Sequence, residues 1–239
     1  MTTEPVDSEG GAGAEHRRRQ EHVLDLMATA AAADRMEVLA PAPDLGADRR
    51  VCLGGFHFPG GSLLEEVRPV RDAVASLPWQ PYLVPERGLH LTVKNVRVAR
   101  DPAGFGQEDV TVVRDAFART LPGRRSFRIY CSRVMVLARS LSIMFTSDPA
   151  FDELVGALDL ALTARGFGDD KQYVNDSHFV LNLTLARFAD PPDAYVRRAV
   201  DEISRRTTLS PYVLDSVTLA SGSPVMSWYR SHGHWALRS

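Results

Sequence analysis

The chain has 239 residues, a formal net charge of −2 and 44% hydrophobic residues. This length supports one domain with a substantial core or two small domains. The near-neutral charge argues against non-specific binding to nucleic acid through overall charge, while leaving room for a local basic cleft. No run of about 18 apolar residues is present, so the sequence predicts no membrane-spanning helix.

The N-terminal segment is predicted to have two parts. Residues 1–15 are rich in Gly and acidic residues and have almost no large apolar residue, which is typical of a disordered tail. Residues 16–47 are predicted to form a helix followed by a linker that begins at a Pro-rich stretch. Charged residues interrupt the apolar run after the basic stretch, so no secretory signal is expected. The helix either packs on the main domain, as amphipathic helices generally do, or serves as an arm to a partner.

The two cysteines, Cys52 and Cys131, lie in apolar, strand-like runs. Free buried thiols are therefore expected rather than a disulfide, and a reducing cytoplasm fits this composition. Neither cysteine takes part in metal-ligand spacing, and the sequence predicts no metal site. The Ala-, Arg- and Asp-rich composition is typical of high-GC bacterial coding sequences.

The main domain is predicted over residues 48–239, where strands and helices are mixed. Apolar residues recur at helical spacing in four segments, 62–77, 107–121, 148–166 and 191–207. Strands are predicted at 49–59, 88–99, 177–189, 210–223 and 227–239, with two more inside 125–147. The two halves resemble each other in element order, as a loose internal duplication does. The sequence thus predicts an α+β fold with two pseudo-symmetric sheet-and-helix lobes around a central cleft.

Two of these strands carry the same short pattern. The stretches GLHLTVKNV and FVLNLTLARF each place a polar residue, Leu and Thr inside an apolar run. Because side chains alternate along a strand, His90, Thr92 and Lys94 share one face, and Asn182 and Thr184 share a face of the second strand. A Thr hydroxyl donates to an oxygen, and His exchanges a proton near neutral pH. Two such strands side by side would hold one phosphate from both sides.

The motif pair resembles the two-histidine phosphoesterase superfamily, which includes 2′-5′ RNA ligase-like proteins and RNA cyclic phosphodiesterases. The resemblance rests on HLTV at 90–93, NLTL at 182–185, their separation of 92 residues and the tail at 212–237, and it covers residues 48–239. It implies a bilobal α+β fold in which two histidines act as general acid and base on a 2′,3′-cyclic phosphate or a 2′-5′ linkage, without metal or cofactor. It further implies that His90 is one acid–base group and that Thr92 and Thr184 hold phosphoryl oxygens.

The sequence departs from this pattern at Asn182, because an amide binds an oxygen but does not exchange a proton at neutral pH. Losing one acid–base partner costs about 10²–10⁴-fold in rate. Three functions therefore stay open. One is a phosphoesterase-like enzyme with a single catalytic His that acts on a nucleotide, an RNA end or a related phosphorylated small molecule. The others are a degenerate nucleotide- or RNA-binding protein, and a recruited biosynthetic enzyme that uses single-His chemistry. The oligomeric state is also open.

Five further residues are candidates for substrate contacts. Lys94 shares the face of His90 and is placed to meet a phosphate, and His57 ends the first strand near the expected cleft. His178 shares the face of Asn182 but lies about 13 Å away along the strand, too far to replace it. Tyr82 precedes the first motif strand, where its ring could stack on a base. Tyr173 lies in the loop before the second motif strand.

Three other polar residues are expected to have ordinary roles. For Arg187, which ends the second motif strand, a solvated or salt-bridged role is expected. His232 and His234 are expected to be partly exposed at the end of a strand. Their His-x-His spacing suggests a metal, but no acidic or Cys partner has ligand spacing nearby.

Overall fold

The computed structural model describes residues 10–32, 48–78, 81–170 and 178–239. In chain order the elements are α1 (Gly10–Ala32), β1 (Val51–His57), α2 (Gly61–Ala75), β2 (Tyr82–Leu83), the 3₁₀ turn η1 (Glu86–Gly88), β3 (Leu91–Arg100), α3 (Gln107–Thr120), β4 (Phe127–Leu137), β5 (Ser140–Ser147), α4 (Ala150–Thr163), β6 (Leu181–Arg187), α5 (Ala194–Arg206), β7 (Tyr212–Leu214), β8 (Ser216–Gly222) and β9 (Tyr229–Ala236). None of the helices in these ranges is long and apolar enough to cross a membrane.

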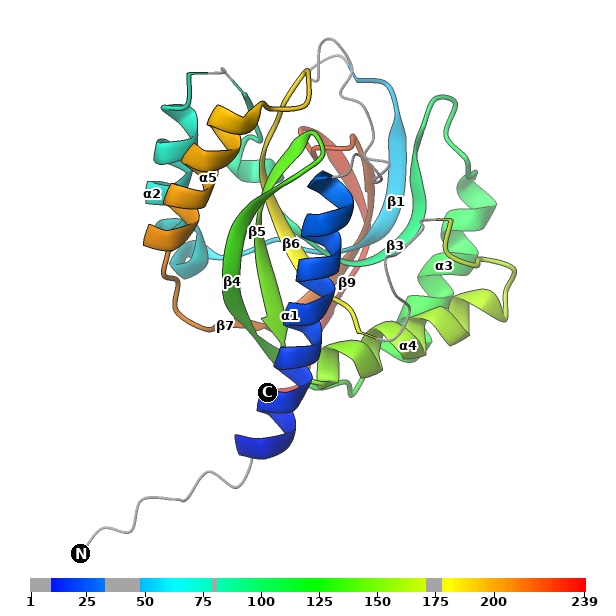
Figure 1. The fold of residues 1–239 in the computed structure, drawn as a ribbon. Coiled ribbons are helices and arrows are strands. Elements are labelled where there is room, and N and C mark those ends of the chain that lie inside the picture. The colour runs from blue at the N-terminus through cyan, green and yellow to red at the C-terminus, as the bar shows by residue number, and fades with distance from the viewer. Residues whose placement is uncertain (1–9, 33–47, 79–80, 171–177) are drawn as a thin grey trace, which may run out of the picture.

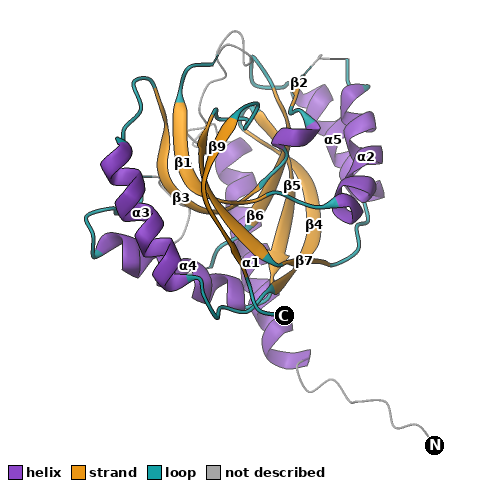
Figure 2. Ribbon diagram, turned by 180° about the vertical axis from the view of Figure 1, so that it is seen from behind, coloured by secondary structure: helices purple, strands orange, loops and turns teal. Residues whose placement is uncertain are grey.

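One curled antiparallel sheet forms the centre of the molecule, in the strand order β7-β4-β5-β6-β3-β1-β8-β9. The two motif strands, β6 and β3, are neighbours in the middle, with three further strands on either side; β2 pairs with β6. Helices α2 and α5 lie beside the β4–β6 half, and α3 and α4 lie beside the half that contains β3 and β9 (Figure 1; Figure 2). The fold is therefore α+β, as the sequence predicted.

Alternation along the motif strands decides which face meets the helices. In β6, Leu181, Leu183 and Leu185 are fully buried, whereas Asn182 and Thr184 are half-buried. The leucines belong to one apolar core shared with the buried stripes of α2, α3, α4 and α5. Because successive strand residues point to opposite faces, the polar motif residues project from the other side of the sheet. We call this side, opposite α2–α5, the motif face.

The C-terminal strands differ from the prediction. The stretch 210–223 was expected to form one strand, but it contains β7, which pairs with β4, and β8, which pairs with β1. The chain passes from one half of the sheet to the other at Asp215, whose carbonyl accepts a hydrogen bond from the backbone N–H of Leu237. A one-residue crossing leaves the alternating pattern almost unchanged, so it is not visible in the sequence. The short strand β2 was also not predicted.

Helix α1 packs on the motif face, where it crosses β4 and β5 (Figure 1). Its Leu24 packs in a small buried cluster with Met135 and Met144. The fully buried Gln20 donates to the Ser147 hydroxyl at 2.9 Å and accepts from the Ser147 backbone N–H at 2.7 Å. The predicted disorder of residues 10–15 is wrong, because α1 begins at Gly10; residues 1–9 and 33–47 lie outside the described residues.

The β4–β5 hairpin turns at Ala138, which has a φ of 51°. The left-handed region costs an L-residue roughly 1–2 kcal/mol, a cost that glycine avoids. Glycine also adds conformational entropy to the unfolded chain, which offsets part of this gain. We therefore expect Ala138→Gly to raise the free energy of unfolding by about 0.5 kcal/mol, measured by urea denaturation. Ala157→Gly inside α4 is the control and should lower it by about 1 kcal/mol. Equal losses in both variants would contradict the argument.

Candidate functional site

The register between β3 and β6 brings the two motifs together. Leu91 lies opposite Leu183 in an antiparallel pair, and both leucines are fully buried. Continuing this register by one residue places His90 opposite Thr184 on the motif face. The same step in the other direction places Thr92 opposite Asn182. We call the resulting group the motif patch: His90, Thr92, Asn182 and Thr184.

His90 is held in one tautomer. Its Nδ1 lies 2.7 Å from the carbonyl oxygen of Gly88, and a carbonyl only accepts, so Nδ1 carries the proton and Nε2 keeps its lone pair. Among the described residues, no other hydrogen bond reaches the ring. Burial lowers the pKa of His90 to about 4, with a smaller lowering from the charge of Arg187 and an opposing effect of the Gly88 hydrogen bond. The ring is therefore neutral at pH 7 and can accept a proton at Nε2.

Gly88 owes its identity to a close backbone approach. A Cβ at this position would lie 2.7 Å from the Val225 carbonyl oxygen and 2.9 Å from that of Met226. Real Cβ atoms do not reach such distances, so a larger residue would displace either the β8–β9 connection or the η1 turn. Since the Gly88 carbonyl orients His90, this packing helps to fix the imidazole.

Asn182 is part of a short chain of polar side chains. Its Nδ2 donates to Thr184 Oγ1 at 3.1 Å, and that hydroxyl lies 3.2 Å from Oγ of the fully buried Ser142. The three side chains come from β6 and β5, in which Ser142 is opposite Thr184. These groups can bind oxygens of a ligand. None of them is an acid or base at neutral pH.

Arg187 joins the motif face through a β-bulge. Ser140 lies opposite Arg187 and Ser142 lies opposite Thr184, so β6 contributes one more residue than β5 over this interval. Because Ser140 and Ser142 share a face, Arg187 faces the same side as Thr184. Its Nε is buried and has no hydrogen-bond partner within the described ranges. Arg187 is thus a candidate anion ligand that the sequence interpretation missed, since simple alternation places it on the opposite face.

Aromatic side chains line one side of His90. The Phe56 ring meets the His90 ring edge to face, with centroids 5.1 Å apart and an interplanar angle of 84°. Phe58 lies 6.3 Å from His90 and stacks on Tyr229 at 4.5 Å. Tyr229 is 42% exposed. Tyr229 thus reaches His90 through Phe58, and such an exposed ring can stack on a flat ligand group such as a base.

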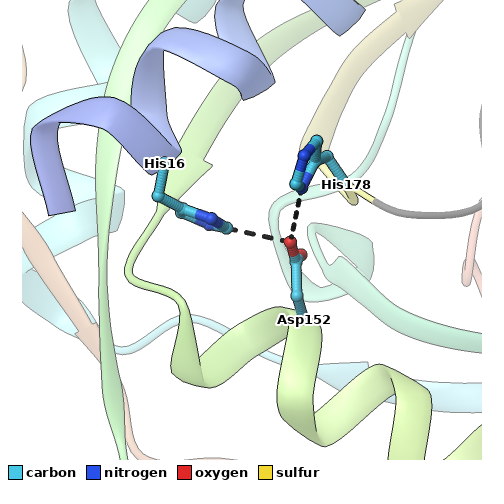
Figure 3. Close-up of side chains that lie close together, drawn as sticks. All are labelled: His16, Asp152 and His178. Carbon is cyan, nitrogen blue, oxygen red and sulfur yellow. Dashed lines mark hydrogen bonds and ion pairs between the residues drawn. The ribbon is translucent and has the colours of Figure 1, made fainter. Parts of the chain in front are cut away.

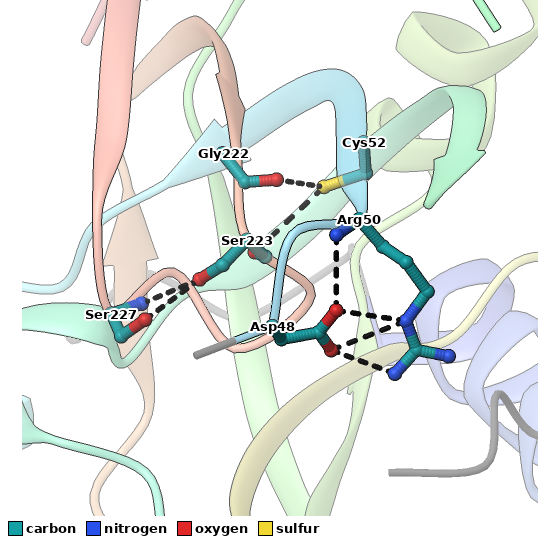
Figure 4. Close-up of polar contacts among 6 residues, drawn as sticks. All are labelled: Asp48, Arg50, Cys52, Gly222, Ser223 and Ser227. Atoms are coloured by element: carbon teal, nitrogen blue, oxygen red, sulfur yellow. Dashed lines mark hydrogen bonds and ion pairs between the residues drawn. The ribbon is translucent and has the colours of Figure 1, made fainter. Parts of the chain in front are cut away.

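The chain around these rings is fixed by polar contacts (Figure 4). The Cys52 thiol donates to the Gly222 carbonyl oxygen at 3.4 Å, and the Ser227 backbone N–H donates to Ser223 Oγ at 3.0 Å. Before β1, the guanidinium of Arg50 holds the carboxylate of Asp48 through several hydrogen bonds. Burial raises the pKa of Cys52 to about 11, so the thiol stays protonated and serves packing. Both cysteines are free, as predicted.

The prediction that Lys94 meets a phosphate is wrong. Gly55 lies opposite Lys94 and Phe56 lies opposite Thr92, so a register shift turns Lys94 away from the face of Thr92. Lys94 is 2% exposed, and its Nζ lies 2.5 Å from Asp159 Oδ1 and 2.6 Å from Asp169 Oδ2. The lysine is therefore part of a buried ion-pair network behind the sheet.

His57 also does not line the motif patch. It is 2% exposed, with Nδ1 2.9 Å from the Ser216 carbonyl oxygen and Nε2 3.0 Å from the Tyr212 hydroxyl. Both ring nitrogens are used inside the protein, so the predicted substrate contact is wrong. Phe56, the residue before it, takes the place on the motif face because neighbouring strand residues alternate.

The other predicted contact residues are spread apart. His178 lies before β6, and its Nδ1 is 3.3 Å from Asp152 Oδ2 on α4, so it contacts α4 rather than Asn182. Tyr82 lies opposite Arg187 in the β2–β6 pair and packs its ring against the main core. Tyr173 falls outside the described residues. A substrate role for Tyr82 stays a prediction.

No family model matches the sequence, and no curated protein matches it. Several solved structures share its fold. A structure of Escherichia coli LigT complexed with 3′-AMP is 16% identical over 80% of this chain and 99% of that chain, with a TM-score of 0.52. A phosphoesterase is 15% identical over 80% and 99%, with a TM-score of 0.53. A conserved protein of unknown function from Agrobacterium tumefaciens is 14% identical over 90% and 97%, with a TM-score of 0.56.

At these identities the likeness concerns the fold. The matches to LigT and to the phosphoesterase span nearly all of those chains and leave a fifth of this chain uncovered. That fifth is about as long as the segment before β1. The two motif strands lie at the centre of the shared sheet. The chain therefore has the α+β fold of the LigT-like phosphoesterases, the fold that the motif pair predicted.

Proposed function

We propose that the motif patch binds the phosphate of a nucleotide or RNA end, and that His90 is its single acid–base group in opening a 2′,3′-cyclic phosphate. The observation that carries the proposal is the Leu91–Leu183 register, which brings both motifs to one face of the sheet. The similar LigT structure holds 3′-AMP, a nucleoside monophosphate of the kind that such a reaction releases. The aromatic rings beside His90 suit the base of such a ligand.

The neutral His90 defines the proton transfers. Nε2 accepts a proton from the water that attacks phosphorus, a P–O bond forms to that water, and one ribose O–P bond breaks. The leaving ribose oxygen takes its proton from solvent, because Asn182 has none to give. The hydroxyls of Thr92 and Thr184 and the guanidinium of Arg187 bind the phosphoryl oxygens, where charge develops. Water adds to the cyclic diester and one phosphate monoester results.

The proposal is tested by the hydrolysis of 2′,3′-cyclic nucleotides by the native chain and by His90→Gln. We expect at least a 100-fold loss of kcat/KM in the variant, because the general base is removed. His22→Gln, on the exposed surface of α1, is the matched control and should retain full activity. Equal binding of 3′-AMP with no turnover by either protein would favour a nucleotide-binding protein. No binding of any such phosphate would favour a recruited enzyme with another substrate.

The pH dependence tests the protonation state of His90. Below its pKa the ring is charged and cannot accept a proton, so activity is lost as the pH falls through this value. With a pKa of about 4 in the free protein, kcat/KM should stay level from pH 7 down to about pH 5 and fall near pH 4. The fall in kcat should lie at higher pH, because a bound phosphate anion stabilises the charged ring. An acidic limb of kcat/KM near the ordinary histidine pKa would contradict this assignment.

A further inference from the structure

A second cluster of ionisable side chains lies away from the motif patch, at the contact between α1 and α4. His16 comes from α1, Asp152 from α4 and His178 from the segment just before β6, and the three side chains converge (Figure 3). His178 Nδ1 lies 3.3 Å from Asp152 Oδ2, and His16 Nε2 lies 3.7 Å from the same oxygen. The two imidazole rings meet edge to face, with centroids 5.8 Å apart. All three residues are half-buried.

The donor set and its spacing suit a transition-metal ion. Each residue offers one ligand atom, and the three atoms lie within 4.8 Å of one another. Bonds of about 2.0–2.2 Å in a tetrahedral site require ligand atoms roughly 3.3–3.5 Å apart. The His178–Asp152 separation of 3.3 Å already meets this requirement, and the His16–Asp152 separation of 3.7 Å nearly does. The ring nitrogens of His16 and His178 lie within 4.8 Å of each other, so the two rings turn toward the ion when it binds. Two imidazoles and one carboxylate are a common ligand set for zinc, with the fourth position left for water.

One ring nitrogen of the cluster makes no hydrogen bond among the described residues. The 3.7 Å between His16 Nε2 and Asp152 Oδ2 is too long for a hydrogen bond, and Nε2 is buried without a hydrogen-bond partner in the described part of the chain. A buried polar atom without a partner is rare and points to a missing ligand.

The carboxylate is already oriented for such a role. Asp152 Oδ1 accepts a hydrogen bond from the Phe179 backbone N–H at 3.1 Å, which leaves Oδ2 directed at both histidines. Ligating carboxylates are usually held by outer hydrogen bonds of this kind. Because Phe179 follows His178 in the chain, the backbone that presents the ring also fixes the carboxylate.

We propose that His16, Asp152 and His178 form a binding site for a divalent first-row transition ion, with zinc as the expected ion. The site joins α1 to the main domain. Gln20, one helical turn after His16, is fully buried and donates to the Phe179 carbonyl oxygen at 2.6 Å, so the same face of α1 makes both contacts. Bound metal therefore cross-links the N-terminal helix to the first turn of α4 and to the segment before β6. This inference is independent of the function proposed for the motif patch.

The experiment uses the full chain after dialysis against a chelator. Titration with Zn²⁺ by calorimetry should show one ion per chain, with a dissociation constant of about 1 μM or lower. Co²⁺ as a spectroscopic probe should give the visible absorption of a four-coordinate site. His16→Gln, Asp152→Asn and His178→Gln should each weaken Zn²⁺ binding at least tenfold. His22→Gln, six residues along the same helix and exposed, is the matched control and should bind like the native chain.

Two results would overturn the proposal. Native protein that binds no Zn²⁺ at about 100 μM would show that the cluster is only a polar contact between α1 and α4. Equal Zn²⁺ binding by native protein and His16→Gln would place the ion elsewhere. Circular dichroism of each variant separates loss of a ligand from loss of fold. His16→Gln is decisive if Asp152→Asn unfolds, because His16 makes no hydrogen bond with its Nε2 among the described residues.

Discussion

The variant Asn182→His should hydrolyse 2′,3′-cyclic nucleotides about 10²–10⁴ times faster than the native chain. The register between β3 and β6 places position 182 opposite Thr92, just as His90 lies opposite Thr184. An imidazole there would stand in the symmetric position on the same face of the sheet. It would donate the proton that the leaving ribose oxygen otherwise takes from water.

Local hydrogen bonding allows this exchange. Asn182 Nδ2 now donates to Thr184 Oγ1 at 3.1 Å, and a ring N–H could donate to the same oxygen. The measurement is kcat with 2′,3′-cyclic nucleotides for Asn182→His, for His90→Gln and for the double variant. Asn182→Leu is the control, because it removes the amide without adding an acid, and it should show no gain. A folded Asn182→His that binds 3′-AMP and gains nothing would contradict the proposed reaction.

The sequence predicted the core of the motif patch because that part depends on period-two alternation. Leu181, Leu183 and Leu185 are buried and the residues between them are not, so the faces of β6 follow from their spacing. The internal similarity of the two halves likewise predicted two sheet-bearing lobes around a cleft, and in the structure the motif strands are neighbours at the centre of one sheet. The register between the strands depends on packing of the whole sheet, which no single strand's pattern determines.

Errors arose where a bulge changes the alternation. One shift in the β1–β3 pair turns Lys94 behind the sheet, and another in the β5–β6 pair turns Arg187 onto the motif face. A one-residue shift exchanges the two faces, so strict alternation gives the wrong side for both residues. Backbone hydrogen bonding across strands decides where a bulge falls, and no short sequence pattern reports it.

The cluster of His16, Asp152 and His178 was beyond sequence reasoning for a different reason. Its members come from three elements, and no pair of them has the spacing of a local metal motif. His16 lies at the start of the predicted N-terminal helix and was not a site candidate, and His178 was interpreted as a substrate-contact residue. Packing of α1 on the motif face brings them together. The prediction that the chain has no metal site rested on local spacing alone and could not test such an arrangement.

The second large effect is expected for Lys94→Met, which should lower the free energy of unfolding by about 3–5 kcal/mol. Lys94 is 2% exposed and lies between the carboxylates of Asp159 and Asp169. Asp169 is itself 13% exposed and also accepts a hydrogen bond from Asn95 Nδ2 at 3.1 Å. Removing the ammonium leaves a buried carboxylate without this counter-charge, and a methionine of similar length cannot supply one. Urea denaturation measures the loss.

The same variant separates two roles for this lysine. Because Lys94 faces away from Thr92, kcat/KM per folded molecule with 2′,3′-cyclic nucleotides should equal that of the native chain in conditions where both are folded. Arg100→Met is the matched control: its side chain is 60% exposed and 3.8 Å from Asp170, so stability should change by less than about 0.5 kcal/mol. A Lys94→Met protein with native stability and lost activity would reinstate the phosphate-binding role. A large loss of stability with native kcat/KM would show that Lys94 stabilises the fold from behind the sheet. Arg187 would then remain the cation proposed to bind phosphate at the motif patch.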